Sequence, residues 1–163
     1  MSHVAEYSKR GALGALGGLA GTVAIQSLLK ASQKWAPSAV PPMRDEPGHF
    51  MVHKAKQALP RSAQSSIPKP IEKGAEQLLG IGYGLTFGAL CAAVRNRRRS
   101  VVVDGALLGT LTWAAGYLGW LPAAGLMPPL WRQRTTQVAA PIAEHVVYGV
   151  ITVAVYDWLN DHL

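Results

Sequence analysis

The stretch GALGALGGLAGTVAIQSLL, residues 11–29, holds no formal charge and almost no polar side chain before Gln26. A helix on the surface of a soluble protein carries a polar face that returns with every turn, and this stretch lacks one. Crossing the hydrocarbon core of a bilayer takes about 20 mostly apolar residues. Residues 11–29 therefore predict a transmembrane helix.

Three further stretches have the same character. They cover residues 77–94, 105–131 and 137–156, and in the last of them Glu144 is the only formal charge. The sequence therefore predicts an all-α membrane protein with four transmembrane helices in a single domain over residues 1–163. The expected bounds are about 11–30, 76–95, 101–121 and 138–159, with an extramembrane loop over 31–75.

Composition agrees with this prediction. Hydrophobic residues make up 49% of the 163 residues and charged residues only 15%, which is unusual for a soluble domain. The formal net charge of +7 comes from basic residues that flank the apolar stretches, where they suit anionic lipid headgroups. We expect the lipid bilayer as a partner and no nucleic acid. With one cysteine, Cys91, the chain cannot form an internal disulfide.

Arginines crowd the short connection after the second apolar stretch. They are Arg95, Arg97, Arg98 and Arg99. The loop over 31–75 holds more basic residues in total, but acidic residues dilute them. Basic residues close to helix ends favour the cytoplasmic side, so total charge and charge density predict opposite orientations. We follow charge density, which makes the arginines topology-setting and places both termini in the cytoplasm.

The loop over 31–75 contains HFMVHKAKQAL, residues 49–59, in which apolar side chains alternate with lysines. This pattern predicts either a short helix on the membrane surface or a mobile polar loop. His49 and His53 are spaced to share one face of such a helix, which makes them weak candidates for metal ligands. We otherwise expect no metal and no cofactor.

An internal repeat relates the two halves of the chain. GALGALGG opens the first predicted helix and DGALLGTLTW the third, while YGLTFGALCA in the second matches YGVITVAVYD in the fourth. Each half is therefore a predicted helical hairpin, and both hairpins enter the membrane in the same direction. Such a parallel repeat predicts a pseudo-twofold axis along the membrane normal.

Three motifs together resemble the YagU-like family of small bacterial inner-membrane proteins. They are a Gly-rich first helix that runs on to PPMR, a third helix that ends in GLMPPLW, and EHVVYG in the last helix. The resemblance covers most of the chain, and the shorter first loop makes it similar to a compact relative. It implies a four-helix protein of the bacterial inner membrane with a link to stress or acid tolerance, and it supplies no established biochemical activity.

Glycines recur at helical spacing in the first two predicted helices. They are Gly14, Gly17, Gly18 and Gly21 in the first and Gly80, Gly84 and Gly88 in the second. Between helices in lipid, close packing through small residues replaces the hydrophobic effect. We expect these faces to hold the four helices together; contact with another copy or another subunit is the alternative.

The last predicted helix carries two ionisable neighbours, Glu144 and His145. A charge inside the membrane is costly, so it normally faces protein or water and has a partner. The expected cluster around them includes Gln26, Tyr83, Tyr117 and Tyr148. Such a group fits a proton relay or a pH sensor. In the structural alternative, Pro141 starts the helix, the helix dipole favours Glu144 in the first turn, and His145 forms one hydrogen bond across the bundle.

These observations lead to a hypothesis about function. The sequence contains no phosphate-binding glycine loop, nucleophile elbow or zinc-protease motif, so we expect no enzyme activity. The leading hypothesis is a structural or accessory membrane component that packs against itself or a partner membrane protein through its glycine faces. The alternative is a small proton-linked transporter or channel that uses Glu144 and His145, and a membrane-bound metal or lipid enzyme comes third.

Overall fold

The structure is a computed structural model that describes residues 3–96 and 98–163. Every regular element in these two ranges is helical, and four helices are long and apolar enough to cross a membrane. They are α1 (His3–Trp35), α4 (Lys69–Val94), α5 (Val101–Ala114) with its continuation to Ala123, and α7 (Thr135–His162). The predicted fold class, an all-α membrane protein with four membrane-crossing helices, is confirmed.

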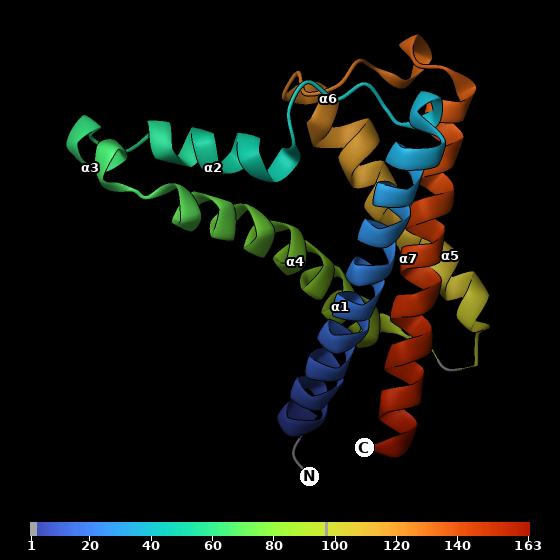
Figure 1. Cartoon of the computed structure of the whole chain (residues 1–163). Coiled ribbons are helices and arrows are strands. Elements are labelled where there is room, and N and C mark those ends of the chain that lie inside the picture. The colour runs from blue at the N-terminus through green and yellow to red at the C-terminus, as the bar shows by residue number, and fades with distance from the viewer. Residues whose placement is uncertain (1–2, 97) are drawn as a thin grey trace.

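The four long helices alternate in direction. α1 and α5 run one way, α4 and α7 run the other way, and the two termini lie at the same end of the bundle (Figure 1). The opposite end carries the connections from α1 to α2 and from α6 to α7, with the 3-10 turns η1 (Pro37–Ala39) and η3 (Leu130–Arg132), whereas the connection from α4 to α5 lies at the end with the termini. Two short helices, α2 (Pro47–Gln57) and α3 (Arg61–Ser66), project sideways together with the start of α4.

Local sequence explains how the third long helix begins and ends. The hydroxyl of Ser100 accepts a hydrogen bond from the backbone N–H two residues later, which caps α5. The helix then passes through a π-helical segment, η2 (Ala115–Trp120), into α6 (Leu121–Ala123). Gly125 ends α6 with φ of 73°, a left-handed conformation in which glycine carries no Cβ penalty. The N–H of Leu126 donates to the carbonyl of Leu121 at 3.0 Å, which completes the cap.

The observed helices extend beyond two of the predicted segments. α1 extends well beyond residues 11–30, because Lys9, Arg10 and Lys30 limit the apolar segment without ending the helix. The connection over 31–75 is also more ordered than a loop, since it holds α2 and α3 as well as the ends of α1 and α4. α2 lies where the sequence predicted a short helix, and it packs against α4.

Glycines allow α1 to approach two neighbours closely. Added Cβ atoms at Gly14 and Gly18 would collide with the backbone of α4, and one at Gly17 would lie 2.5 Å from the carbonyl oxygen of Thr152 on α7. The predicted glycines at such close approaches are Gly14, Gly17, Gly18, Gly21, Gly84 and Gly88. Gly80 does not belong with them, because a Cβ there meets nothing within 4 Å. α4 has already diverged from α1 at that level.

A second set of glycines joins α5 to α7. A Cβ at Gly105 would lie 2.7 Å from the backbone nitrogen of Val150, and one at Gly149 would lie 2.6 Å from the backbone nitrogen of Gly109. These glycines were not among those predicted from the sequence. They lie in the same backbone-to-backbone contact as those on α1, and the small side chains permit the close approach.

α4 is the least enclosed of the four long helices. Of its membrane-length segment 17% is buried, against 33–39% for the other three. Its buried residues, Gly84, Gly88 and Ala92, all lie in its second half. A pseudo-twofold relation would place α4 against α5 as closely as α1 lies against α7, yet α4 and α5 have few contacts. The repeat thus remains a prediction, and the packing departs from it at this seam.

Candidate functional site

Glu144 lies inside the bundle near the end that carries η1 and η3. Its exposed fraction is 7%, and its Oε1 atom accepts a hydrogen bond of 2.6 Å from the hydroxyl of Ser32 on α1. α7 begins at Thr135, so Pro141 lies within the helix and Glu144 is well past the first turn. The structural alternative that placed Glu144 beside the helix dipole is therefore wrong. Its partner is a hydroxyl group from another helix.

His145 and Tyr117 form a ring contact beside this carboxylate. Their rings meet edge to face with centroids 5.6 Å apart. The Nδ1 of His145 lies 2.7 Å from the carbonyl oxygen of Pro141 one turn earlier, so His145 bonds within its own helix and not across the bundle. Tyr117 is buried in the π-helical segment η2, where Gly119 departs from helical geometry with φ of −96° and ψ of −108°. Segments of this kind often occur at functional sites.

The other predicted members of the cluster lie elsewhere. The hydroxyl of Tyr148 donates to the carbonyl oxygen of Gly84 at 3.1 Å, and that of Tyr83 donates to Thr112 at 3.4 Å. Gln26 is exposed on α1. The predicted group of six therefore does not form one cluster. Glu144, His145 and Tyr117 lie together, whereas Tyr148 joins α7 to α4 and Tyr83 joins α4 to α5.

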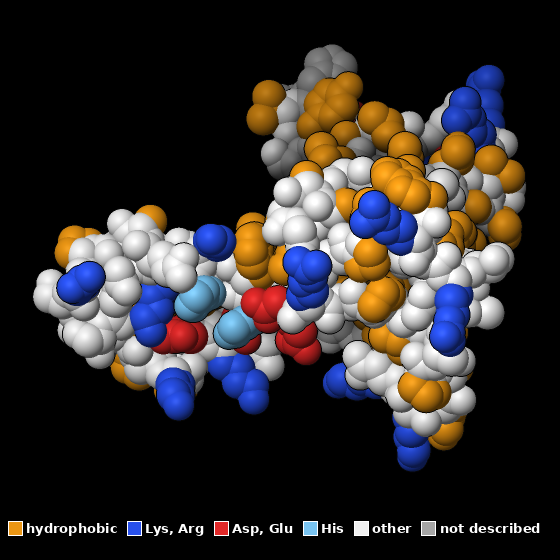
Figure 2. Space-filling model, turned by 90° about the horizontal axis from the view of Figure 1, so that it is seen from above, with side chains coloured by type: hydrophobic (Ala, Val, Ile, Leu, Met, Phe, Trp, Pro, Cys, Tyr) orange, Lys and Arg blue, Asp and Glu red, His pale blue; other side chains and the backbone are white. Residues whose placement is uncertain are grey.

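The two loop histidines share one face of α2, as predicted from their spacing. The rings of His49 and His53 stack with centroids 6.0 Å apart, and His49 Nδ1 lies 2.8 and 2.9 Å from the two carboxylate oxygens of Asp45. Charged side chains gather over this arm of the molecule, whereas hydrophobic ones cover much of the bundle (Figure 2). Across residues 3–96 and 98–163 no group of three His, Cys, Asp or Glu side chains is placed to hold a metal ion.

The pair between His49 and Asp45 should depend on pH. Hydrogen bonding to Asp45 raises the pKa of His49, and hydrogen bonding to His49 lowers the pKa of Asp45. Its stabilisation is fully present between the ordinary pKa values of the two groups. It is lost as pH rises through the raised pKa of His49, or falls through the lowered pKa of Asp45. Asp45→Asn should lower the pKa of His49, measured by NMR titration. The control Glu6→Gln, near the N-terminus at the far end of α1, should leave this pKa unchanged. An equal pKa of His49 in the unmodified protein and both variants would contradict the pairing.

An arginine at the opposite end of the bundle joins three helices. The side chain of Arg95 is 1% exposed, and its Nη1 donates to Asp104 on α5 at 2.6 Å. Its Nη2 donates to Asp157 on α7 at 2.7 Å. Nη1 also donates to the carbonyls of Asn96 and Arg99, at 2.7 and 3.0 Å. A buried guanidinium needs such a complete set of partners, because an unpaired buried charge is costly.

Arg10 adds the remaining long helix to this arrangement. Its Nη2 atom donates to the carbonyl oxygens of Ala92 and Arg95, at 2.7 and 3.2 Å, and its Nε donates to the hydroxyl of Tyr156 at 3.2 Å. Carbonyls in the last turn of a helix lack partners within the helix, and a cation also suits that end of the helix dipole. We call Arg10, Arg95, Asp104, Tyr156 and Asp157 the arginine clamp.

The clamp changes the interpretation of the basic connection. Arg95 is not available to lipid headgroups, whereas Arg98 and Arg99 are exposed. Arg97, the fourth predicted topology-setting residue, lies outside the described residues. Sequence reasoning also missed Ser32, which is one of several ordinary serines, and Arg10, which resembles any basic residue before an apolar stretch. Isolated carboxylates at the ends of the third and fourth helices were the available signal for the clamp.

The four long apolar helices place this chain in the class of multi-pass α-helical membrane proteins. Comparison of the chain with models of protein families, with curated protein sequences and with solved structures gives no match.

Proposed function

We propose that this protein is an accessory component of the membrane, without catalytic chemistry of its own, that binds another membrane protein or a second copy through α4. The observation that carries the proposal is the low burial of this helix, 17% of its membrane-length segment. α1, α5 and α7 are held together by close glycine contacts and by the arginine clamp. α4 shares these contacts in its second half alone, and its first half packs against α2. The side of α4 that faces neither the bundle nor α2 is therefore available to a partner.

The outer face of α4 has the composition of a helix-packing surface. We define it by Leu78, Leu79, Gly82 and Thr86. Leu78, Gly82 and Thr86 follow one another at about one helical turn, and Leu79 lies beside Leu78 on the side opposite the glycines that contact α1. Leu78 is 69% exposed, and a Cβ at Gly82 would meet nothing within 4 Å. Thr86 bonds to its own helix, with its hydroxyl 2.8 Å from the carbonyl oxygen of Gly82. Small residues on such a face let another helix approach closely in lipid.

Site-specific photo-crosslinking in the native membrane tests this proposal. A photoreactive amino acid at Leu78 should give a covalent product of defined protein mass, and Gly82→Leu should suppress it. The matched control is Leu16, which is 48% exposed on the outward side of α1 and should react with lipid alone. Products confined to lipid at both positions would contradict association through α4.

We also propose the membrane, the orientation and the family of this protein from its sequence. The resemblance to the YagU-like family supports a bacterial inner membrane, and the exposed Arg98 and Arg99 support cytoplasmic termini. An accessory role is compatible with a family linked to stress or acid tolerance, since such a role needs no substrate.

Proton-linked transport is the second candidate, and Glu144 favours it. A buried carboxylate beside a histidine, a tyrosine and a π-helical segment is an arrangement that can exchange a proton. If this is the function, Glu144→Gln abolishes pH-driven flux in liposomes, while Ser32→Ala alters its pH dependence. Absence of flux in the unmodified protein, or unchanged flux in Glu144→Gln, would exclude this candidate and leave the accessory role.

A further inference from the structure

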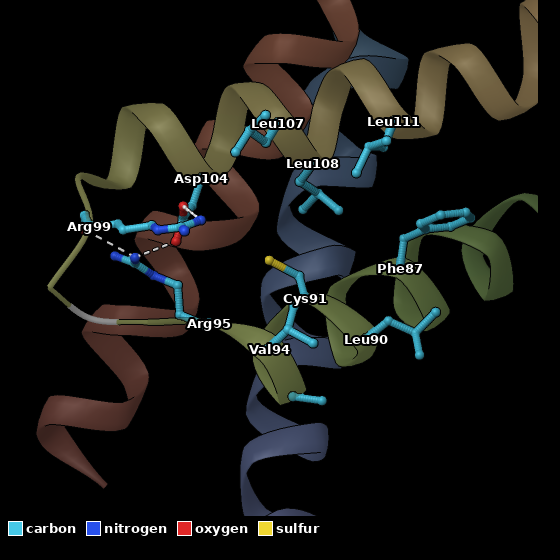
Figure 3. Close-up of a pocket in the computed structure, with 11 residues that line it drawn as sticks. Phe87, Leu90, Cys91, Val94, Arg95, Arg99, Asp104, Leu107, Leu108 and Leu111 are labelled. Carbon is cyan, nitrogen blue, oxygen red and sulfur yellow. Dashed lines mark hydrogen bonds and ion pairs between the residues drawn. The ribbon is translucent and has the colours of Figure 1, made fainter.

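The seam between α4 and α5 contains a groove of about 420 Å³. Its apolar wall on α4 consists of Phe87, Leu90, Cys91 and Val94, and Leu107, Leu108 and Leu111 form the facing wall on α5 (Figure 3). The wall on α4 extends for about two helical turns, or roughly 11 Å. The volume lies in the range of pockets that hold small ligands.

One end of the groove is charged. Arg95, Arg99 and Asp104 lie there, at the connection between the two helices (Figure 3). The guanidinium of Arg95 is committed to the clamp. The Arg99 side chain is 63% exposed, and its Nη1 lies 3.9 Å from Asp104 Oδ1, a long contact for an ion pair. Arg99 therefore retains donors that can bind an anion, whereas Arg95 does not.

We propose that this groove binds one anionic phospholipid, with an acyl chain between α4 and α5 and the phosphate on Arg99. The groove matches such a lipid in both shape and charge. Apolar walls that end at an exposed guanidinium match an amphiphile with a hydrocarbon tail and an anionic head. A partner helix would fit less well, because its apolar face would have to continue past the charged end. The site is separate from the outer face of α4 and does not depend on the proposed partner.

Bound lipid would also account for the departure from the sequence repeat. α4 and α5 would be joined through an acyl chain where α1 and α7 join directly through glycines. The lipid would occupy the place of the missing helix contact. The groove then keeps its width in the membrane because the lipid fills it.

Native mass spectrometry of the delipidated full-length protein, titrated with phosphatidylglycerol or phosphatidylcholine, tests the site. The unmodified protein should retain phosphatidylglycerol more strongly. Arg99→Gln should weaken this retention about fivefold, which corresponds to about 1 kcal/mol for one basic residue at a membrane surface. Leu111→Trp, which fills the groove, should weaken retention of both lipids.

Two matched controls separate a specific site from general attraction. Arg98→Gln removes a neighbouring exposed arginine that does not line the groove, and Val102→Trp adds bulk on the opposite side of α5; both should behave like the unmodified protein. Phosphatidylglycerol should also slow alkylation of Cys91, which lines the groove. Equal effects of Arg98→Gln and Arg99→Gln, no effect of Leu111→Trp, or unchanged alkylation of Cys91 would overturn the proposal.

Discussion

Arg95→Gln should destabilise the protein by roughly 3–5 kcal/mol, because it removes a buried charge on which two carboxylates depend. The side chains of Asp104 and Asp157 are 12% and 16% exposed, so water can replace little of what they lose. The end of α4 would also separate from α5 and α7. Thermal unfolding in detergent, monitored by the loss of helical circular dichroism, measures the change in stability.

Two further variants show whether charge pairing is the cause. Arg98→Gln changes an exposed arginine three residues away and should stay within about 0.5 kcal/mol of the unmodified protein. Combining Arg95→Met with Asp104→Asn and Asp157→Asn removes all three charges of the ion group together, and replacing a complete buried ion group in this way is often tolerated. The combination should recover much of the lost stability. If Arg95→Gln unfolds at the same temperature as the unmodified protein, the arginine clamp does not contribute to stability.

Gly149→Ala should have the second largest effect, because the added methyl group would overlap the backbone of α5. The nearest atoms belong to Gly105 and Gly109, and backbone atoms cannot move aside as a flexible side chain can. Overpacking of this kind typically lowers the free energy of unfolding by about 1–3 kcal/mol. Because the added methyl group would push two helices apart, we expect a loss at or above the upper end of this range. The same thermal assay measures this change.

Gly80→Ala is the matched control for Gly149→Ala. Gly80 lies in a helix of the same kind, but open space surrounds the position of its Cβ. Replacing glycine by alanine there should be neutral or should stabilise the helix by up to about 1 kcal/mol. Equal destabilisation at Gly80 and Gly149 would show that helix propensity, and not close packing, determines the effect of these glycines.

The fold was predictable because a bilayer imposes a simple requirement on sequence. Each crossing needs a long apolar segment, and four such segments are visible without any structure. Helix bounds were less predictable, since Lys9 and Lys30 mark the end of the apolar segment while the helix continues past them. Pro141 was misleading for a related reason, because a proline is tolerated inside a membrane helix when neighbouring groups satisfy the backbone.

The sites were harder to predict because they depend on how helices are rotated and tilted. Spacing in the sequence placed Gly80 on the same stripe as Gly84 and Gly88, but the tilt of α4 separates it from α1. The direction in which a side chain points depends on the rotation of its helix, which the sequence does not give. Tyr83 and Tyr148 were predicted to lie in one cluster, but their hydroxyls donate to different helices. Arg95 pairs with Asp157, 62 positions away. No local pattern in the sequence predicts a contact over that distance.

The most direct test of the proposed accessory role is native mass spectrometry of the protein extracted from its own membrane in mild detergent, compared with Gly82→Leu. A Cβ at Gly82 meets nothing within 4 Å. We therefore expect Gly82→Leu to fold as a single chain and to block close approach to the outer face of α4. The account predicts a defined complex, with a second copy or another membrane protein, that Gly82→Leu dissociates and Gly80→Leu does not. A single chain carrying lipid alone, with no difference between the variants, would contradict it.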